Sequence, residues 1–172
     1  MDNEIGGKIP REIINAHARA HKESRVDDAC VTSSAAFTHH IDDEGWLSGL
    51  IRAAKPGEIK RGAEKVAKRY GEKVDVIETY LDDLSIPVPD FLRNHWKVWI
   101  LTFEKGMGGH MFAAIRDDRD TNLDRFFVWD TDTESGGGEF FSRMSARGIL
   151  ERIKHQHQGV GYYYLIGFNK QD

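Results

Sequence analysis

Trp96-Lys97-Val98-Trp99-Ile100-Leu101-Thr102-Phe103 is the stretch that decides the fold class of this chain. The run is rich in aromatic and β-branched residues, which is typical of a buried β-strand. Further strands are predicted over 110–116, 125–130 and 159–168, and a glycine-rich turn over 104–109 connects the first two strands. Strands joined by turns and polar loops favour an antiparallel sheet. The second half of the chain is therefore expected to form such a sheet.

The first half of the chain carries helical patterns instead. Helices are predicted over 10–23, 29–41, 46–54 and 59–70, with Pro10 at the start of the first, Asp27 or Asp28 capping the second and Gly71 closing the last. Ser145 is expected to cap one more helix, which extends to about His155. Helices followed by antiparallel strands indicate the α+β class. We expect one domain over 1–172, with a flexible arm over 1–8, a helical lobe over about 9–90 and a sheet lobe over about 95–170.

Composition excludes several classes of protein. The 172 residues include 24 basic and 28 acidic ones, and this net charge of −4 offers no electrostatic footprint for nucleic acid. Apolar runs fall far short of the ~20 residues that a membrane helix needs, and no signal peptide is recognisable. We expect a soluble protein that stays in the cytoplasm or leaves by a route without a cleavable signal.

No cofactor and no metal site are expected. The acidic segment 118–124 alternates like a calcium loop but lacks its glycine and its final glutamate. The pair His39 and His40 has no convincing third ligand and is assigned to the surface.

Cys30 is the only cysteine, so the chain cannot form an internal disulfide. It lies at the beginning of the predicted helix 29–41, where free backbone N–H groups and the helix dipole stabilise a thiolate. Its alternative role is that of a small buried side chain. A nucleophilic role requires a base and an orienting group from elsewhere in the fold.

His110 and Asp130 supply these two groups. His110 begins one predicted strand and Asp130 ends the next, so a hairpin with its centre near position 120 places them directly opposite each other. Directly opposed residues share a face of the sheet. The carboxylate can then hold one imidazole nitrogen and leave the other for a thiol. The sequence therefore predicts a hydrolytic site made of Cys30, His110 and Asp130.

This order and spacing resembles the papain-like cysteine peptidase superfamily. Its members carry the cysteine at the start of a helix, the histidine at the beginning of a strand and Asp or Asn at the end of the next strand. The matching segments are Asp27-Asp28-Ala29-Cys30, Gly109-His110-Met111-Phe112-Ala113-Ala114-Ile115 and Phe126-Phe127-Val128-Trp129-Asp130, within a resemblance that spans about 22–168. The interval of 80 residues between Cys30 and His110 is most similar to the compact bacterial branch. That branch includes the leader peptidases of bacteriocin exporters and papain-fold effectors and toxins.

The resemblance implies a papain-like fold, in which a helical lobe carrying the cysteine helix packs on a C-terminal antiparallel sheet. It implies a cysteine hydrolase that acts on an amide bond of a protein or peptide through a thioester intermediate. It further implies a bacterial effector or toxin, with a target protein and an inhibitor or immunity protein as partners. Water as the acceptor gives a peptidase, amidase or deamidase, and a lysine amine gives a transglutaminase. A peptidoglycan amidase and a catalytically silent papain-fold binding module are further alternatives.

The resemblance also bears on the residues around the triad. Ser24 stands where papain-like peptidases commonly carry the glutamine that stabilises the oxyanion, so its hydroxyl and the Cys30 backbone N–H are the expected donors. Gly108 and Gly109 leave room for a substrate backbone beside the histidine. Trp129 either shields the His–Asp hydrogen bond or packs on the opposite face of the sheet.

Overall fold

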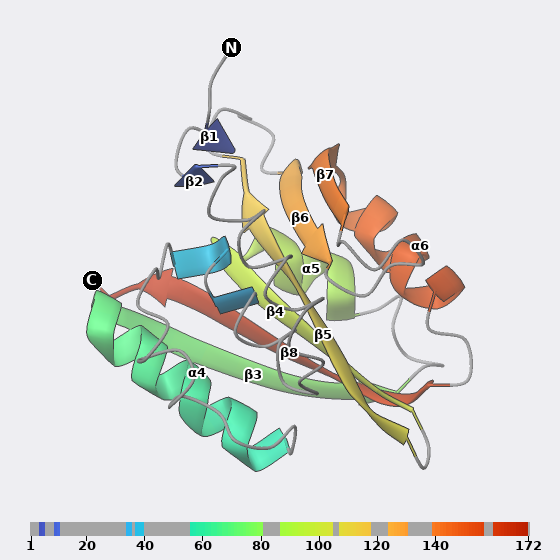
Figure 1. The fold of residues 1–172 in the computed structure, drawn as a ribbon, viewed down its shortest axis with the longest axis horizontal. Helices are drawn as coiled ribbons and strands as arrows, with labels where there is room; N and C mark the ends of the chain where they lie inside the picture. Colours follow the sequence, from blue (N-terminus) through green and yellow to red (C-terminus); the bar gives the residue numbers. More distant parts are fainter. Residues whose placement is uncertain are drawn as a thin grey trace.

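The chain forms a mixed α+β structure built around one large antiparallel sheet. The computed structural model describes residues 4–5, 9–10, 34–35, 37–39, 56–80, 87–104, 107–117, 124–130, 139–156 and 160–171. Within this part of the chain, six strands lie in the order β3-β8-β4-β5-β6-β7, and every neighbouring pair is antiparallel (Figure 1). The α+β class expected from the sequence is confirmed.

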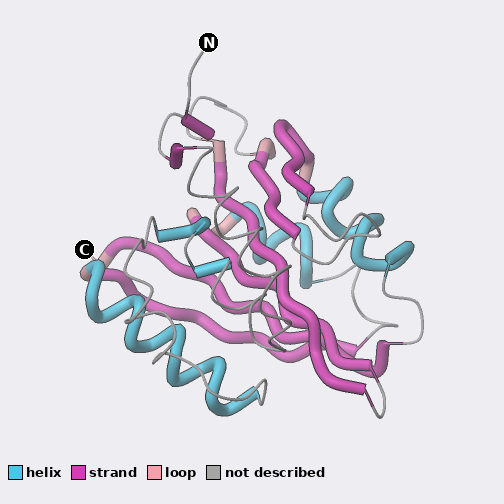
Figure 2. Tube along the Cα trace, in the orientation of Figure 1, coloured by secondary structure: helices cyan, strands magenta, loops and turns pink. Residues whose placement is uncertain are grey.

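Among the described residues of the second half of the chain, four strands follow one another between helices α5 and α6, and a last strand, β8, follows α6 (Figure 2). The strands of the large sheet are β3 (Glu72–Tyr80), β4 (Lys97–Glu104), β5 (Met107–Arg116), β6 (Phe126–Asp130), β7 (Glu139–Met144) and β8 (Val160–Lys170). The helices are α4 (Pro56–Tyr70), α5 (Pro87–Arg93) and α6 (Ala146–Gln156). Two short strands, β1 (Glu4–Ile5) and β2 (Ile9–Pro10), pair with each other. No described helix is long and apolar enough to span a membrane.

Strand β4 lies inside the sheet because its side chains are apolar on both faces. It pairs with β8 on one side and with β5 on the other. Val98 and Ile100 project to one face, Trp99 and Leu101 to the opposite face, and all four are buried. A continuous apolar run suits a strand that is covered on both sides, which is why this stretch predicted the sheet correctly.

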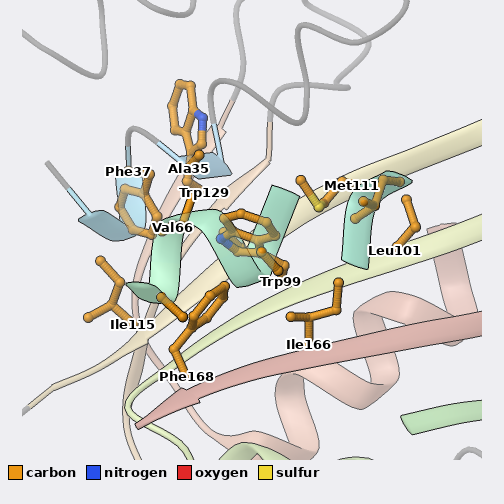
Figure 3. Close-up of a cluster of buried hydrophobic side chains, with 14 of the residues drawn as sticks. Ala35, Phe37, Val66, Trp99, Leu101, Met111, Ile115, Trp129, Ile166 and Phe168 are labelled. Carbon is orange, nitrogen blue, oxygen red and sulfur yellow. The ribbon is translucent and has the colours of Figure 1, made fainter. Parts of the chain in front are cut away.

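Two hydrophobic clusters cover the two faces. The first, here the α4-side core, joins α4 to the sheet, and Figure 3 shows Trp99 among its members. The second, here the α6-side core, lies under α5 and α6. Ala35 and Phe37, which belong to short helical segments at 34–35 and 37–39, pack into the α4-side core. These segments agree with the predicted helix 29–41, whose other residues lie outside the described part of the chain.

Local signals set the helix ends as expected. Helix α4 buries Ile59, Ala63 and Val66 on one side and ends at Gly71, whose φ of +66° belongs to the left-handed region that glycine adopts at low cost. The Ser145 hydroxyl accepts a hydrogen bond from the Gly148 N–H at 3.0 Å. This contact caps the N-terminus of α6 as predicted.

The predicted boundary between the helical lobe and the sheet lobe is wrong. Strand β3 falls inside the range assigned to the helical lobe, yet it pairs with β8 along its whole length. Glu72–Tyr80 mixes charged and apolar residues directly after α4, and this pattern places one side of the strand against α4 while leaving charged residues at the surface. Helix α5 and strand β7 were likewise not predicted.

The N-terminal expectations also change. Pro10 is the last residue of β2, where the prediction has the first residue of a helix, and β1 lies within the segment assigned to a flexible arm. Proline is compatible with the end of a short strand, where no backbone donor is required. The predicted helix 46–54 and the rest of the predicted helix 10–23 lie outside the described residues.

Candidate functional site

The pairing of β5 with β6 differs from the predicted register. Asp130 lies opposite Phe112 and not opposite His110. The predicted register of the two strands is therefore wrong by two residues. A shift of two residues preserves the strand phase, because side chains alternate with a period of two. Position 110 therefore keeps the phase of Phe112 and becomes a diagonal neighbour of Asp130. Diagonal neighbours are separated by roughly 7–8 Å, a distance that long and aromatic side chains span.

Asp130 is a fully buried acid at the end of β6. Its carboxylate lies on the α6 side of the sheet, because Asp130 pairs with Phe112 of the α6-side core. There the Arg152 Nη2 donates a hydrogen bond to Asp130 Oδ2 at 3.3 Å. The Arg152 side chain is 13% exposed, so the interaction lies mostly away from water. The arginine charge compensates the buried carboxylate from the helix side.

Trp129 faces the other way. It is 3% exposed and belongs to the α4-side core together with Ala35 and Phe37 (Figure 3). Of the two roles considered for this residue, packing on the face opposite Asp130 is the one observed. Trp129 also connects the end of β6 to the helical segments that follow Cys30 in the sequence.

The remaining predicted site residues are only partly described. Gly108 and Gly109 belong to β5, and Gly109 lies opposite Phe103, next to a register shift in the β4–β5 ladder. His110 is placed by its backbone in β5, and its side chain lies outside the described part of the structure. Cys30 and Ser24 lie outside the described residues.

A buried polar network fastens the helical segment 37–39 to the sheet. The Trp99 Nε1–H donates to Thr38 Oγ1 at 2.9 Å, and Thr38 Oγ1 lies 2.7 Å from His39 Nδ1. On the other side of the ring, His39 Nε2 lies 2.6 Å from Glu72 Oε1. Lys97 Nζ donates to the second oxygen of the same carboxylate at 2.8 Å. The network therefore connects the helical segment to β3 and β4 through buried hydrogen bonds.

The environment of His39 differs from the one that the sequence predicted. The prediction placed it at the surface, but its side chain is completely buried and packs against Trp99, Phe168 and Tyr70. A histidine is retained in such a site because each ring nitrogen finds a polar partner. The sequence held no local signal for this role, since Glu72 is 33 residues away along the chain.

The Glu72 carboxyl remains ionised despite its burial. Burial alone raises the pKa of this group, and the hydrogen bonds and charges of His39 and Lys97 outweigh that effect, so the pKa lies below its ordinary value of 4.5. A group with a lowered pKa contributes stability that is present above its unfolded-state pKa and is lost as the pH falls through the folded-state pKa. The network thus favours the folded protein at neutral pH and weakens in acid.

Replacing Glu72 with glutamine is expected to lower the unfolding free energy at pH 7 by about 1.5–3 kcal/mol, because charge-assisted hydrogen bonds are lost. The difference from the native protein should shrink as the pH falls below 4.5, because the carboxyl of the unfolded chain becomes protonated first and the native carboxyl follows at its lower pKa. Urea titrations between pH 3 and pH 7 measure both effects. Glu64→Gln on the exposed side of α4 is the matched control and should change stability little. A constant difference across this pH range would contradict the prediction.

Among the side chains that the structure describes, His95 is the other buried histidine, and its contacts are structural. Nδ1 lies 2.7 Å from the Phe91 carbonyl oxygen, and Nε2 lies 2.9 Å from Asp75 Oδ2. The ring also covers Gly167 so closely that a Cβ atom there would lie 2.4 Å from it. Both ring nitrogens of His95 are engaged in holding α5 against β3.

No protein-family model matches this chain, and no curated protein matches its sequence. The described residues also contain no cluster of three or more His, Cys, Asp or Glu side chains suited to a metal ion. The structure brings the backbone of His110 and the buried carboxylate of Asp130 to the same end of adjoining strands. A functional assignment therefore depends on the residues of the chain itself.

Proposed function

We propose that the chain is a cysteine hydrolase of papain-like architecture that acts on an amide bond of a protein or peptide. The observation that carries the proposal is the common strand phase of His110 and Asp130 near the meeting ends of β5 and β6. In this proposal Cys30 is the nucleophile, His110 is the general base and then the acid, and Asp130 orients the imidazole.

The helical segment that follows Cys30 in the sequence is fixed on the α4 side of the sheet. Ala35 shares the α4-side core with Trp129 of β6, and His39 contacts Glu72 of β3. The segment packs on the face of the sheet opposite Asp130. In this proposal, the Cys30 thiol therefore approaches His110 around the end of the sheet.

The proposed reaction proceeds through a thioester. The Cys30 thiolate attacks the amide carbon, His110 protonates the leaving amine, and a thioester forms. Water then attacks the thioester while His110 accepts its proton, which releases the carboxylic acid and restores the thiolate. The Cys30 backbone N–H and the Ser24 hydroxyl are the proposed donors to the oxyanion. Gly108 and Gly109 are proposed to line the substrate path.

The biological setting is part of the same proposal. A soluble papain-like hydrolase of this size fits a bacterial effector or toxin that modifies a target protein and is restrained by an inhibitor or immunity protein. A glutamine deamidase or transglutaminase uses the same thioester and differs only in its acceptor. A catalytically silent binding module is the second candidate, and the hydrogen bond from Arg152 to Asp130 favours it, because that carboxylate already has a structural partner.

Mass spectrometry of a proteome-derived peptide library tests the proposal. Incubation with the native protein is expected to produce peptide fragments, a mass gain of about 1 Da from deamidation, or conjugates with an added amine, depending on the acceptor. Cys30→Ser is the matched control and should produce none of these products. Identical spectra for the two proteins would contradict the hydrolase and favour the binding module.

A further inference from the structure

The outer edge of the sheet next to α4 has the features of a peptide-binding groove. A cavity of about 590 Å³ follows this edge. Its walls are α4, with Lys60, Glu64 and Lys68, and the consecutive residues 72–76 of β3. The cavity lies on the side of β3 that faces away from β8, and Figure 1 shows α4 running alongside β3.

Strand β3 offers unused backbone hydrogen bonds along this cavity. It pairs with β8 on one side, and among the residues that the structure describes no strand pairs with its other side. In a strand, alternate residues direct their N–H and C=O groups to opposite edges. Alternate residues of β3 therefore present a row of donors and acceptors at its outer edge, and residues 72–76 of the strand line the cavity. Such an edge can accept an additional strand.

The charge available in the groove is positive. Lys60, Lys68 and Lys73 line it, are exposed, and form no ion pair with any described residue. Two of the three lining acids are engaged elsewhere, since Glu72 contacts His39 and Lys97, and Asp75 contacts His95. Glu64 is the remaining acid. The groove thus offers more uncompensated cations than anions.

We propose that this groove binds an extended acidic peptide segment of a partner protein, which adds to the sheet beside β3. Backbone hydrogen bonds to the strand edge supply the binding energy, and the three lysines select acidic side chains. A segment of about five residues matches residues 72–76, since a strand rises about 3.3 Å per residue. A second copy of the chain is a poorer occupant, because pairing two β3 edges brings two sets of lysines together. This proposal does not depend on the proposed hydrolase function.

Fluorescence anisotropy with defined probes tests the proposal on the chain of 172 residues. The probe is a fluorescein-labelled peptide of alternating aspartate and valine, and the comparison peptide alternates lysine and valine. A third peptide has the acidic sequence with N-methyl groups on its central residues, which block both of its edges and leave its charge unchanged. Cys30→Ser is titrated in parallel, so that cleavage of a probe is not mistaken for weak binding.

The acidic peptide is expected to bind at least about tenfold more tightly than either comparison peptide. Lys60→Glu/Lys68→Glu/Lys73→Glu should weaken its binding about tenfold or more, because three favourable charge pairs become repulsive. A control with the same change of charge outside the groove, Lys65→Glu/Arg147→Glu/Lys154→Glu, should keep the native affinity. Hydrogen exchange should show slower exchange of the amides in 72–76 when the acidic peptide is bound.

Three outcomes would overturn the proposal. Equal binding of the N-methylated peptide means that no strand is added. Equal binding of the basic peptide, or equal weakening by both triple variants, means that the groove lysines do not select the ligand. Unchanged exchange of 72–76 at saturating peptide means that the peptide binds elsewhere on the protein.

Discussion

Replacing Asp130 with alanine is expected to lower the free energy of unfolding by about 3–5 kcal/mol, because the substitution removes one partner of a buried ion pair. The Asp130 side chain is fully buried, and its carboxylate accepts a hydrogen bond from Arg152, whose side chain is only 13% exposed. Urea denaturation followed by circular dichroism measures the change. Asp90→Ala is the matched control, because Asp90 is 80% exposed and contacts Arg93 at the surface. Its effect should stay within about 0.5 kcal/mol. Equal stability of the two variants would contradict the structural role of Asp130.

A double variant separates this structural role from the proposed catalytic one. Asp130→Leu/Arg152→Met removes both charges together and is expected to recover most of the stability that Asp130→Ala loses, since no buried charge is left uncompensated. If Asp130 orients His110, the double variant still loses the activated state of Cys30, because leucine cannot accept a hydrogen bond from the imidazole or stabilise an imidazolium. Native thiol reactivity in a folded double variant would show that Asp130 is not part of the triad.

The sheet could be predicted from local sequence wherever a strand is buried on both faces or a turn is marked by glycine. The run 96–103 is apolar on both sides and became β4, and the cap at Ser145 began α6 as expected. Strand β3 was missed because it follows Gly71 without a loop and mixes charged with apolar residues. Its place in the sheet depends on pairing with β8, which is distant in the sequence.

The candidate site, too, could be predicted only in part from the sequence. The sequence correctly predicted that His110 belongs to a strand and that Asp130 ends the next one. It did not determine which residues of the two strands face each other, because a polar loop of this length has no single centre. The buried partners could not be foreseen either. Arg152 and Glu72 reach Asp130 and His39 only through tertiary packing, and neither pair has a sequence spacing that marks it.

The central claim is that Cys30 is an activated nucleophile and that His110 activates it. The chain has one cysteine, so alkylation by iodoacetamide reports on Cys30 alone. An ordinary thiol with a pKa near 8.5 reacts about 100-fold faster at pH 8 than at pH 6, because only its thiolate is nucleophilic. A thiolate stabilised by an imidazolium and a helix N-terminus is already formed at pH 6.

The most direct test is therefore the rate of Cys30 alkylation between pH 6 and pH 8, measured by mass spectrometry on the folded native protein and on His110→Ala. The native rate is expected to change less than about threefold over this range, and the His110→Ala rate is expected to rise about 100-fold. A native rate that rises about 100-fold with pH, or labelling that occurs only after denaturation, would contradict the claim.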